Sequence, residues 1–215
     1  MFPTFPPAPY ILVLLRHGES VGNAEGYHQG QSDFPLSDTG RLQTQALANR
    51  WHTENVTFDH LISSPLLRAR ETAEIIASAI NLPIEFKPDW MERDAGLLSG
   101  LHHEDASQRF PRPAFMHPYQ PVGVTGESQW ELFLRAGRAV QSLLDYPPGH
   151  FLVVSHGGIL NMAFYAILGI VPQANFTGPR FKFSNTGFAS LSYTPDEHAW
   201  RVLGINDHAH WRDEE

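Results

Sequence analysis

"YILVLLRHGES", at residues 10–20, runs from an unbroken apolar segment directly into charged and polar residues. A continuous apolar run of this kind is typical of a strand that is covered on both faces. A second such run, "FLVVSHGG" at residues 151–158, also ends in a His-Gly pair. Because ligands of open α/β sheets bind beyond the carboxyl ends of the strands, we expect His17 and His156 to meet at one edge of a sheet.

The rest of the chain alternates between helix and strand patterns. Besides a short helix near 104–110, we expect helices at about 37–51, 65–80, 127–144 and 157–168 and strands at about 11–15, 58–63, 82–88, 151–155, 187–193 and 200–205. Ser64 would cap the second helix with Pro65 as its first residue, and Pro195-Asp196 would turn the last two strands into an antiparallel hairpin. This order predicts a three-layer α/β/α fold, whose mostly parallel central sheet has an antiparallel C-terminal edge strand.

The length of the chain fits one domain over residues 1–215. The stretch from Asp89 to Thr125 is loop-rich and contains many prolines, so we expect a small inserted cap at about 97–125. The N-terminal "MFPTFPPAPY" lacks a charged segment and is interrupted by prolines. It predicts an extended lead-in to the first strand and no signal peptide.

Composition narrows the classes of function. The net charge of -8 and the lack of a Lys/Arg cluster argue against a nucleic acid or an anionic membrane as partner. The absence of cysteine excludes disulfides, thiolate metal sites and a cysteine nucleophile. No apolar stretch is long enough to span a bilayer comfortably, so we expect a soluble, cytoplasmic protein.

Reactive side chains follow three of the predicted strands. The three groups are Arg16 with His17, Ser63-Ser64 with Arg68 one helical turn later, and Ser155 with His156 and Gly157. Helix N-termini after Ser64 and Gly157 would add unpaired N–H groups, which favour anions. Each residue alone could have a purely structural role, but their coincidence at three strand ends predicts a phosphate site.

Further motifs occur in a fixed order along the chain. They are "LLRHGES" followed by Asn23, "QGQSDFPLSDTGRLQ", "ISSPLLRARETAEII", "MERDAG", "GES" at 126–128, "VVSHGG" and "FSNTGF". This ordered set resembles the histidine phosphatase superfamily, in its phosphoglycerate mutase-like branch. The resemblance extends from Ile11 to about Gly187 and implies an enzyme that transfers a phosphoryl group without a metal or another cofactor.

The resemblance also implies a role for each motif residue. His17 would be the nucleophile that forms a phosphohistidine, and it must attack as the neutral imidazole, so acid should inhibit. Glu92 would be the general acid and base, although Glu19, Asp94 and Glu104 are alternatives. Arg16, Arg68 and His156, with backbone N–H groups near Gly157, would bind the phosphoryl oxygens. Asn23, Gln29 and Gly30 would line the phosphate or substrate site.

The motifs say less about which molecule accepts the phosphoryl group from His17. In the mutases of this family, cationic residues after the catalytic glutamate grip the carboxylate of the substrate. Here His102-His103 stand where a lysine is expected, and Arg109 and Arg112 are not adjacent. We therefore expect a phosphomonoesterase that acts on a small phosphorylated substrate, with phosphoglycerate mutase as the alternative. The ester itself stays open, and an exposed edge strand could support a homodimer.

Two other classes of protein are alternatives to a phosphatase or a mutase. A binding module that has lost turnover is disfavoured, because the nucleophile and its cationic partners are all present. The twelve histidines could suggest a metallohydrolase. However, "HEDASQRF" and "NDHAHW" do not supply a coherent set of metal ligands.

Overall fold

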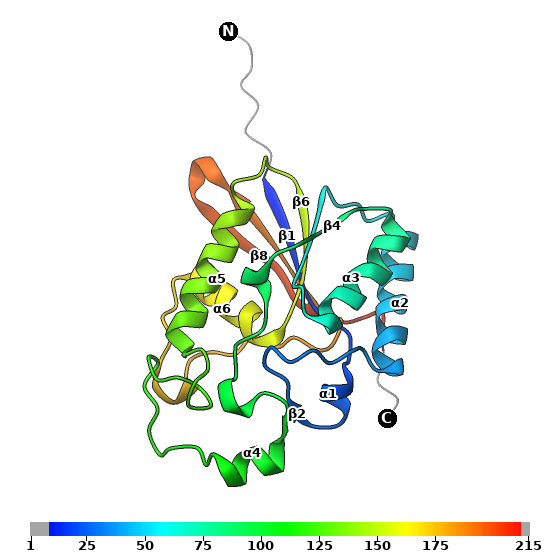
Figure 1. Ribbon diagram of the computed structural model, residues 1–215. Coiled ribbons are helices and arrows are strands. Elements are labelled where there is room, and N and C mark those ends of the chain that lie inside the picture. The colour runs from blue at the N-terminus through cyan, green and yellow to red at the C-terminus, as the bar shows by residue number, and fades with distance from the viewer. Residues whose placement is uncertain (1–8, 212–215) are drawn as a thin grey trace.

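A six-stranded sheet forms the centre of the molecule in the computed structural model, which describes residues 9–211 (Figure 1). Its strands lie in the order β4-β3-β6-β1-β7-β8. They are β4 (Ile84–Phe86), β3 (His60–Ser63), β6 (His150–Ser155), β1 (Tyr10–Arg16), β7 (Phe188–Thr194) and β8 (Ala199–Asp207). The first four are mutually parallel, β7 runs antiparallel to β1, and β8 runs antiparallel to β7. The mostly parallel sheet and the C-terminal hairpin are confirmed.

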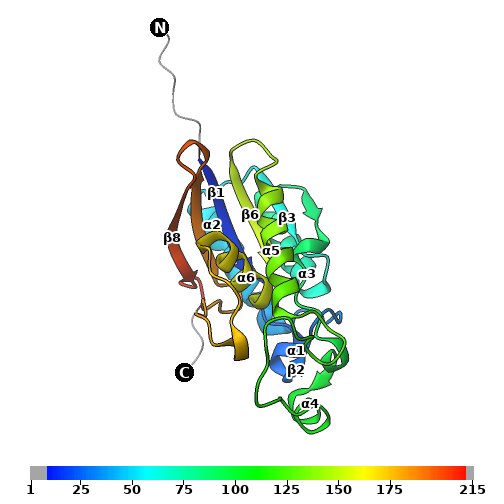
Figure 2. The same cartoon turned by 90° about the vertical axis from the view of Figure 1, so that its left-hand side faces the viewer.

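Helices cover both faces of this sheet, which confirms the three-layer prediction (Figure 2). On one face, α2 (Asp38–Thr53) and α3 (Leu67–Ile80) pack their apolar sides into a core with Leu15, Leu152 and Val154. On the other face, α5 (Gln129–Leu143) and α6 (Gly157–Leu168) pack against Leu12, Leu14 and Val153. Alternate residues of β1 and β6 thus enter opposite cores, as continuous apolar strands require. Within residues 9–211, no helix combines the length and the apolar character needed to cross a membrane.

A smaller group of elements lies beyond the carboxyl ends of β1 and β6 (Figure 1). It comprises α1 (Val21–Ala24), β2 (Tyr27–His28), β5 (Leu101–His102) and α4 (His103–Arg109). Single 3₁₀ turns occur at 88–90, 96–98, 174–176 and 195–197. β2 and β5 form a two-stranded antiparallel sheet, which connects the loop after β1 to the segment 97–125. Two-residue strands have no periodicity, so this pairing could not be predicted from the sequence.

The predicted start of α3 is wrong. The helix begins at Leu67, and its N-cap Leu66 makes no side-chain capping bond. The Leu67 N–H instead donates to Asp33 Oδ1 at 2.9 Å, so a carboxylate from a distant loop caps the helix. The Ser64 hydroxyl accepts from the Leu66 N–H at 3.3 Å, ahead of the first helical residue, and also lies 2.8 Å from His156 Nε2. The predicted lead-in before β1 falls largely outside the described residues.

Candidate active site

The two histidines meet because the strands that precede them are neighbours in register. Arg16 at the end of β1 pairs with Ser155 at the end of β6. The next residues, His17 and His156, therefore leave the sheet side by side, with ring centroids 5.0 Å apart. Only 3% of His17 and 0% of His156 is exposed, so both imidazoles are removed from bulk water.

The tautomer of His17 follows from its backbone contact. Its Nδ1 lies 2.6 Å from the Gly18 carbonyl oxygen, which can only accept a hydrogen bond. Nδ1 therefore carries the proton, and Nε2 presents its lone pair. Burial, and after it the positive charges of Arg68 and Arg16, lower the pKa of His17 well below its usual value. His17 is a neutral imidazole with an available nucleophilic nitrogen.

Two arginines flank His17 without a carboxylate partner within residues 9–211. Arg16 Nη1 donates to the Phe183 carbonyl at 2.8 Å. Arg68, which is 1% exposed, donates to the carbonyls of Ser32 at 3.0 Å and Gly30 at 2.9 Å. Burial lowers the pKa of Arg68 to about 10 and also lowers that of Arg16. These bonds fix both guanidinium groups while leaving much of their charge uncompensated.

Three buried nitrogen atoms around His17 have no hydrogen-bond partner among the described residues. They are Arg16 Nε, Arg68 Nε and His156 Nδ1. The other ring nitrogen of His156 contacts the Ser64 hydroxyl at 2.8 Å. If that hydroxyl donates to Nε2, His156 Nδ1 carries the proton and is a donor. An unsatisfied buried polar group costs roughly 1–3 kcal/mol, so three of them near one nucleophile indicate a site for a ligand rich in acceptors.

Glu92 is held opposite the histidines by backbone groups. Its carboxylate accepts hydrogen bonds from the Arg93 N–H at 2.8 Å and the Gly158 N–H at 3.0 Å. The second of these donors belongs to the first turn of α6, which itself begins directly after His156. The position of Glu92 is therefore tied to the same strand end that carries His156.

Arg135 of α5 braces the loop that carries Glu92. Its guanidinium donates to the carbonyls of Asp89 at 2.9 Å, Met91 at 2.7 Å and Glu92 at 3.2 Å. It also forms an ion pair with Glu127, with a shortest distance of 2.6 Å. Arg135 was not among the predicted site residues. The available signal was an arginine on the buried side of α5, among the apolar positions of that helix.

A cavity of about 360 Å³ collects most of the predicted site residues. Its walls are formed by Arg16, His17, Asn23, Tyr27, His28, Gln29, Gly30, Arg68, Glu92 and Gly157. His156 is the one predicted site residue outside this lining, and its ring centroid lies 5.0 Å from that of His17. Tyr27 and His28 were not anticipated, although they directly precede the predicted Gln29-Gly30 pair.

The three carboxylates given above as alternatives to Glu92 serve local structure. The Ser37 hydroxyl at the start of α2 donates to Glu19 at 2.6 Å, and Asp94 accepts from the Gly96 N–H at 2.8 Å. Glu104 is exposed in the first turn of α4. None of these three lines the cavity.

The side-chain amides of Asn23 and Gln29 in the cavity are linked to neighbouring residues by hydrogen bonds. The Ser20 hydroxyl lies 2.9 Å from Asn23 Oδ1 and 2.7 Å from Gln29 Oε1. Asn185, in the "FSNTGF" motif, donates to the His17 carbonyl at 3.2 Å and to Asn23 at 3.3 Å. Asn185 therefore connects the nucleophile to the amide wall, a role that the motif alone did not indicate.

The histidine-rich C-terminal segment forms structural contacts. Asp207 forms a two-bond ion pair with Arg50, at 2.6 and 2.9 Å, and His210 contacts the Thr186 hydroxyl at 2.8 Å. Across residues 9–211, no group of three His, Asp or Glu side chains is arranged to hold a metal ion.

This chain is similar to known proteins in both sequence and fold. The sequence matches the profile of the Histidine phosphatase superfamily (branch 1) over residues 12–208. It is 35% identical over 195 residues to a probable phosphoglycerate mutase, GpmB, of Citrobacter koseri, covering 89% of this chain and 87% of that one. It is 29% identical over 197 residues to an uncharacterized phosphatase, PhoE, of Bacillus subtilis, covering 92% and 94%. A solved mycobacterial glucosyl-3-phosphoglycerate phosphatase in complex with VO3 aligns with a TM-score of 0.77 at 27% identity, covering 92% and 98%.

Proposed function

Because this chain belongs to the histidine phosphatase superfamily (branch 1), we propose that it is a phosphomonoesterase that forms a phosphohistidine on His17. The observation that carries the proposal is a set of buried nitrogen atoms, Arg16 Nε, Arg68 Nε and His156 Nδ1, that have no partner among residues 9–211 and surround a neutral imidazole. A phosphoryl group supplies the acceptor oxygens that these donors lack. The same donors would stabilise the charge on the equatorial oxygens during transfer.

In the first step, His17 Nε2 attacks phosphorus. The Nε2–P bond forms while the bond between phosphorus and the ester oxygen breaks. Glu92 donates a proton to the departing oxygen, so the leaving group departs as a neutral alcohol. The contact of Nδ1 with the Gly18 carbonyl supports the positive charge that develops on the ring.

In the second step, water replaces the alcohol. Glu92, now a carboxylate, takes a proton from the attacking water while the new O–P bond forms and the Nε2–P bond breaks. Inorganic phosphate and neutral His17 are the products. All proton movements are thus assigned to one carboxyl group, whose position is fixed by the Arg93 and Gly158 N–H groups.

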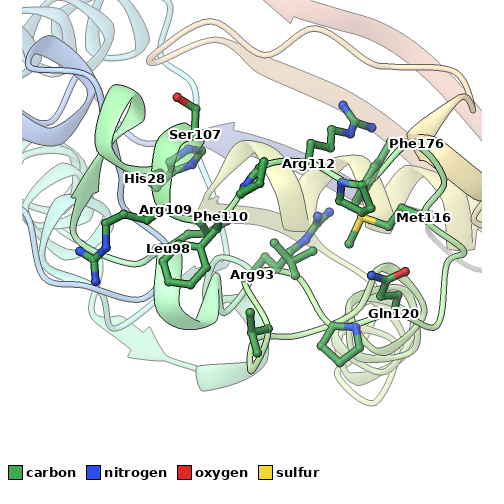
Figure 3. Close-up of a pocket in the computed structure, with 17 residues that line it drawn as sticks. His28, Arg93, Leu98, Ser107, Arg109, Phe110, Arg112, Met116, Gln120 and Phe176 are labelled. Carbon is green, nitrogen blue, oxygen red and sulfur yellow. The ribbon is translucent and has the colours of Figure 1, made fainter.

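Hydrolysis is favoured over mutase activity by the surroundings of the cavity. His102 and His103 pack against Tyr27 and His28, with ring centroids 5.6 and 4.4 Å apart, and do not line the catalytic cavity. Arg109 and Arg112 line a different cavity (Figure 3). The 35% identity to a probable phosphoglycerate mutase supports the mutase as the second candidate.

The direct test is phosphate release from a panel of small phosphomonoesters, with EDTA present. A parallel assay measures the isomerisation of 3-phosphoglycerate, and rapid quenching traps acid-labile phosphate on the protein. We expect phosphate release that persists in EDTA and disappears, with the trapped intermediate, in His17→Ala. Isomerisation faster than release would establish the mutase, and loss of activity in EDTA would overturn a metal-independent mechanism.

A further inference from the structure

The carboxyl end of β8 reaches the loop that holds the nucleophile. Because β7 is antiparallel to β1 and β8 is antiparallel to β7, β8 runs in the direction of β1, and the two strands end at the same edge of the sheet. The segment at this end, "NDHAH" at residues 206–210, contacts "SNT" at residues 184–186 through Asn206 and His210. Neither residue has a role in the proposed mechanism.

The loop at 184–186 holds the backbone on both sides of the nucleophile's peptide bond. The Thr186 N–H donates to two carbonyl oxygens, that of Arg16 at 3.1 Å and that of His17 at 3.2 Å. The side-chain amide of Asn185 also donates to the His17 carbonyl, at 3.2 Å. Since these bonds all start from one loop, a shift of the loop would also shift the backbone from which the His17 ring projects.

Thr186 makes these bonds in a strained backbone conformation. Its φ angle is 56°, in the left-handed region, which is a genuine outlier for a β-branched residue. A residue in such a conformation persists only where the surrounding structure imposes it. Thr186 is 0% exposed, so the contacts that impose its conformation come from the protein.

His210 supplies one of those contacts, as a hydrogen-bond donor. The Thr186 hydroxyl donates its single proton to the Asn185 carbonyl at 2.7 Å. The hydroxyl oxygen therefore accepts from His210 Nε2, which lies 2.8 Å away and must carry the proton. Burial, and after it the proximity of His208 and Arg50, lower the pKa of His210 to about 4. The ring is therefore a neutral imidazole near pH 7, with its one proton on Nε2.

The segment that carries His210 is itself anchored to the rest of the fold. Asp207 forms a two-bond ion pair with Arg50 of α2, at 2.6 and 2.9 Å. Asn206 Oδ1 accepts from the Ser184 N–H at 2.6 Å. The segment is thus bound to α2 on one side and to the loop at 184–186 on the other, so His210 contacts Thr186 from a fixed position.

From these contacts we infer that His210 is a positioning residue for the nucleophile. Its Nε2–H holds Thr186, and the Thr186 N–H in turn holds the backbone of His17. His210 does not line the catalytic cavity, so it acts on the reaction through Thr186 alone. The inference rests on the proposed function, because it concerns the direction in which His17 Nε2 faces the phosphate.

Two polar substitutions of different length test this inference. The amide nitrogen of His210→Gln reaches the position of Nε2 and keeps a donor for Thr186, whereas the shorter side chain of His210→Asn does not reach it. A misplacement of about 1 Å can cost roughly 100-fold in rate. We therefore expect His210→Asn to slow phosphohistidine formation by roughly 10- to 100-fold, and His210→Gln to recover most of the rate. The assay is rapid quenching with saturating 4-nitrophenyl phosphate, corrected for the folded fraction by circular dichroism.

A second variant removes the acceptor of the same contact. Thr186→Val should slow phosphohistidine formation by the same factor as His210→Asn, so it decides the question if His210→Asn does not fold. The double variant should be no slower than either single one, because all three lose one shared contact. His208→Asn is the matched control. The His208 ring packs against that of His210 with centroids 5.3 Å apart, and its buried Nε2 has no hydrogen-bond partner within residues 9–211. This variant should keep the full rate.

The outcomes separate this inference from the proposed function. An unchanged rate in His210→Asn and Thr186→Val, or a His210→Gln variant as slow as His210→Asn, would overturn the inference while leaving the phosphatase intact. An equal loss in His208→Asn would also overturn it, because the packing of the segment and not the hydrogen bond would then matter. Absence of phosphohistidine in the unmodified protein would overturn the proposed function, and the inference with it.

Discussion

Gly158 offers a way to displace Glu92 without altering any proposed catalytic side chain. Gly158 is the second residue of α6, and its N–H donates to Glu92 Oε2 at 3.0 Å. A Cβ atom added at Gly158 would overlap Glu92 Oε1. The helix backbone at this point is fixed by the strand that precedes it, so in Gly158→Ala the Glu92 side chain must turn away.

The loss of activity in Gly158→Ala should depend on the leaving group of the substrate. A positioned general acid contributes roughly 10²–10⁴ in rate, which corresponds to about 2.7–5.5 kcal/mol of barrier. We expect Gly158→Ala to lower the rate of the first turnover of an alkyl phosphate by about 10² or more. With 4-nitrophenyl phosphate the loss should be much smaller, because 4-nitrophenolate departs without a proton. Rapid-quench measurement of phosphohistidine formation with both esters is the assay.

Gly137→Ala is the matched control. Gly137 lies inside α5, where the nearest contact of an added Cβ is the Ala166 Cβ at an ordinary 3.8 Å. This variant should keep full activity and gain roughly 0.5–1 kcal/mol of helix stability. Equal losses for the two esters in Gly158→Ala would mean that the phosphate site itself was damaged. Unchanged activity with the alkyl ester would refute the role assigned to Glu92.

Three further predictions concern the histidines and their support. Ser64→Ala removes the contact of His156 Nε2, and we expect roughly 1–3 kcal/mol less transition-state stabilisation, measured as kcat/KM, with phosphohistidine still formed. Gly40→Ala places a Cβ against the Glu19 carbonyl in the loop after His17, so chemical denaturation should show about 1–3 kcal/mol of destabilisation. The pKa values of His17 and His156 are both lowered, so below about pH 6.5 the unfolded chain binds more protons than the folded one. The free energy of unfolding should therefore fall as the pH drops below 6.5, by up to about 1.4 kcal/mol per pH unit for each imidazole, and a flat profile from about pH 5 to about pH 8 would contradict this.

The strands and the site edge could be predicted because burial dictates their sequence. β1 and β6 need apolar side chains on both faces, and a polar residue can follow only where the strand leaves the sheet. The positions of His17 and His156 are therefore visible in the sequence. The register of β1 against β6 is not visible in the sequence, since it depends on the backbone pairing of Arg16 with Ser155.

What the sequence could not predict is set by contacts between distant segments. Asp33 caps the Leu67 N–H at the start of α3, whereas the Ser64 hydroxyl accepts from the Leu66 N–H ahead of the helix and contacts His156 across the sheet. Arg135 supports the Glu92 loop from a position 43 residues away in the chain. No local propensity encodes either contact, since each depends on the assembled tertiary structure.

The cationic character of the site serves two parts of the proposed chemistry. In the proposed mechanism Arg16 and Arg68 attract the phosphate, and the same charges, together with burial, lower the pKa of His17. A protonated imidazole cannot attack phosphorus, so phosphate binding and nucleophile activation depend on the same two arginines. Replacing either arginine with a neutral residue would weaken phosphate binding and would also make His17 easier to protonate. The acid limb of kcat/KM should then move to higher pH, an effect that a loss of binding alone would not produce.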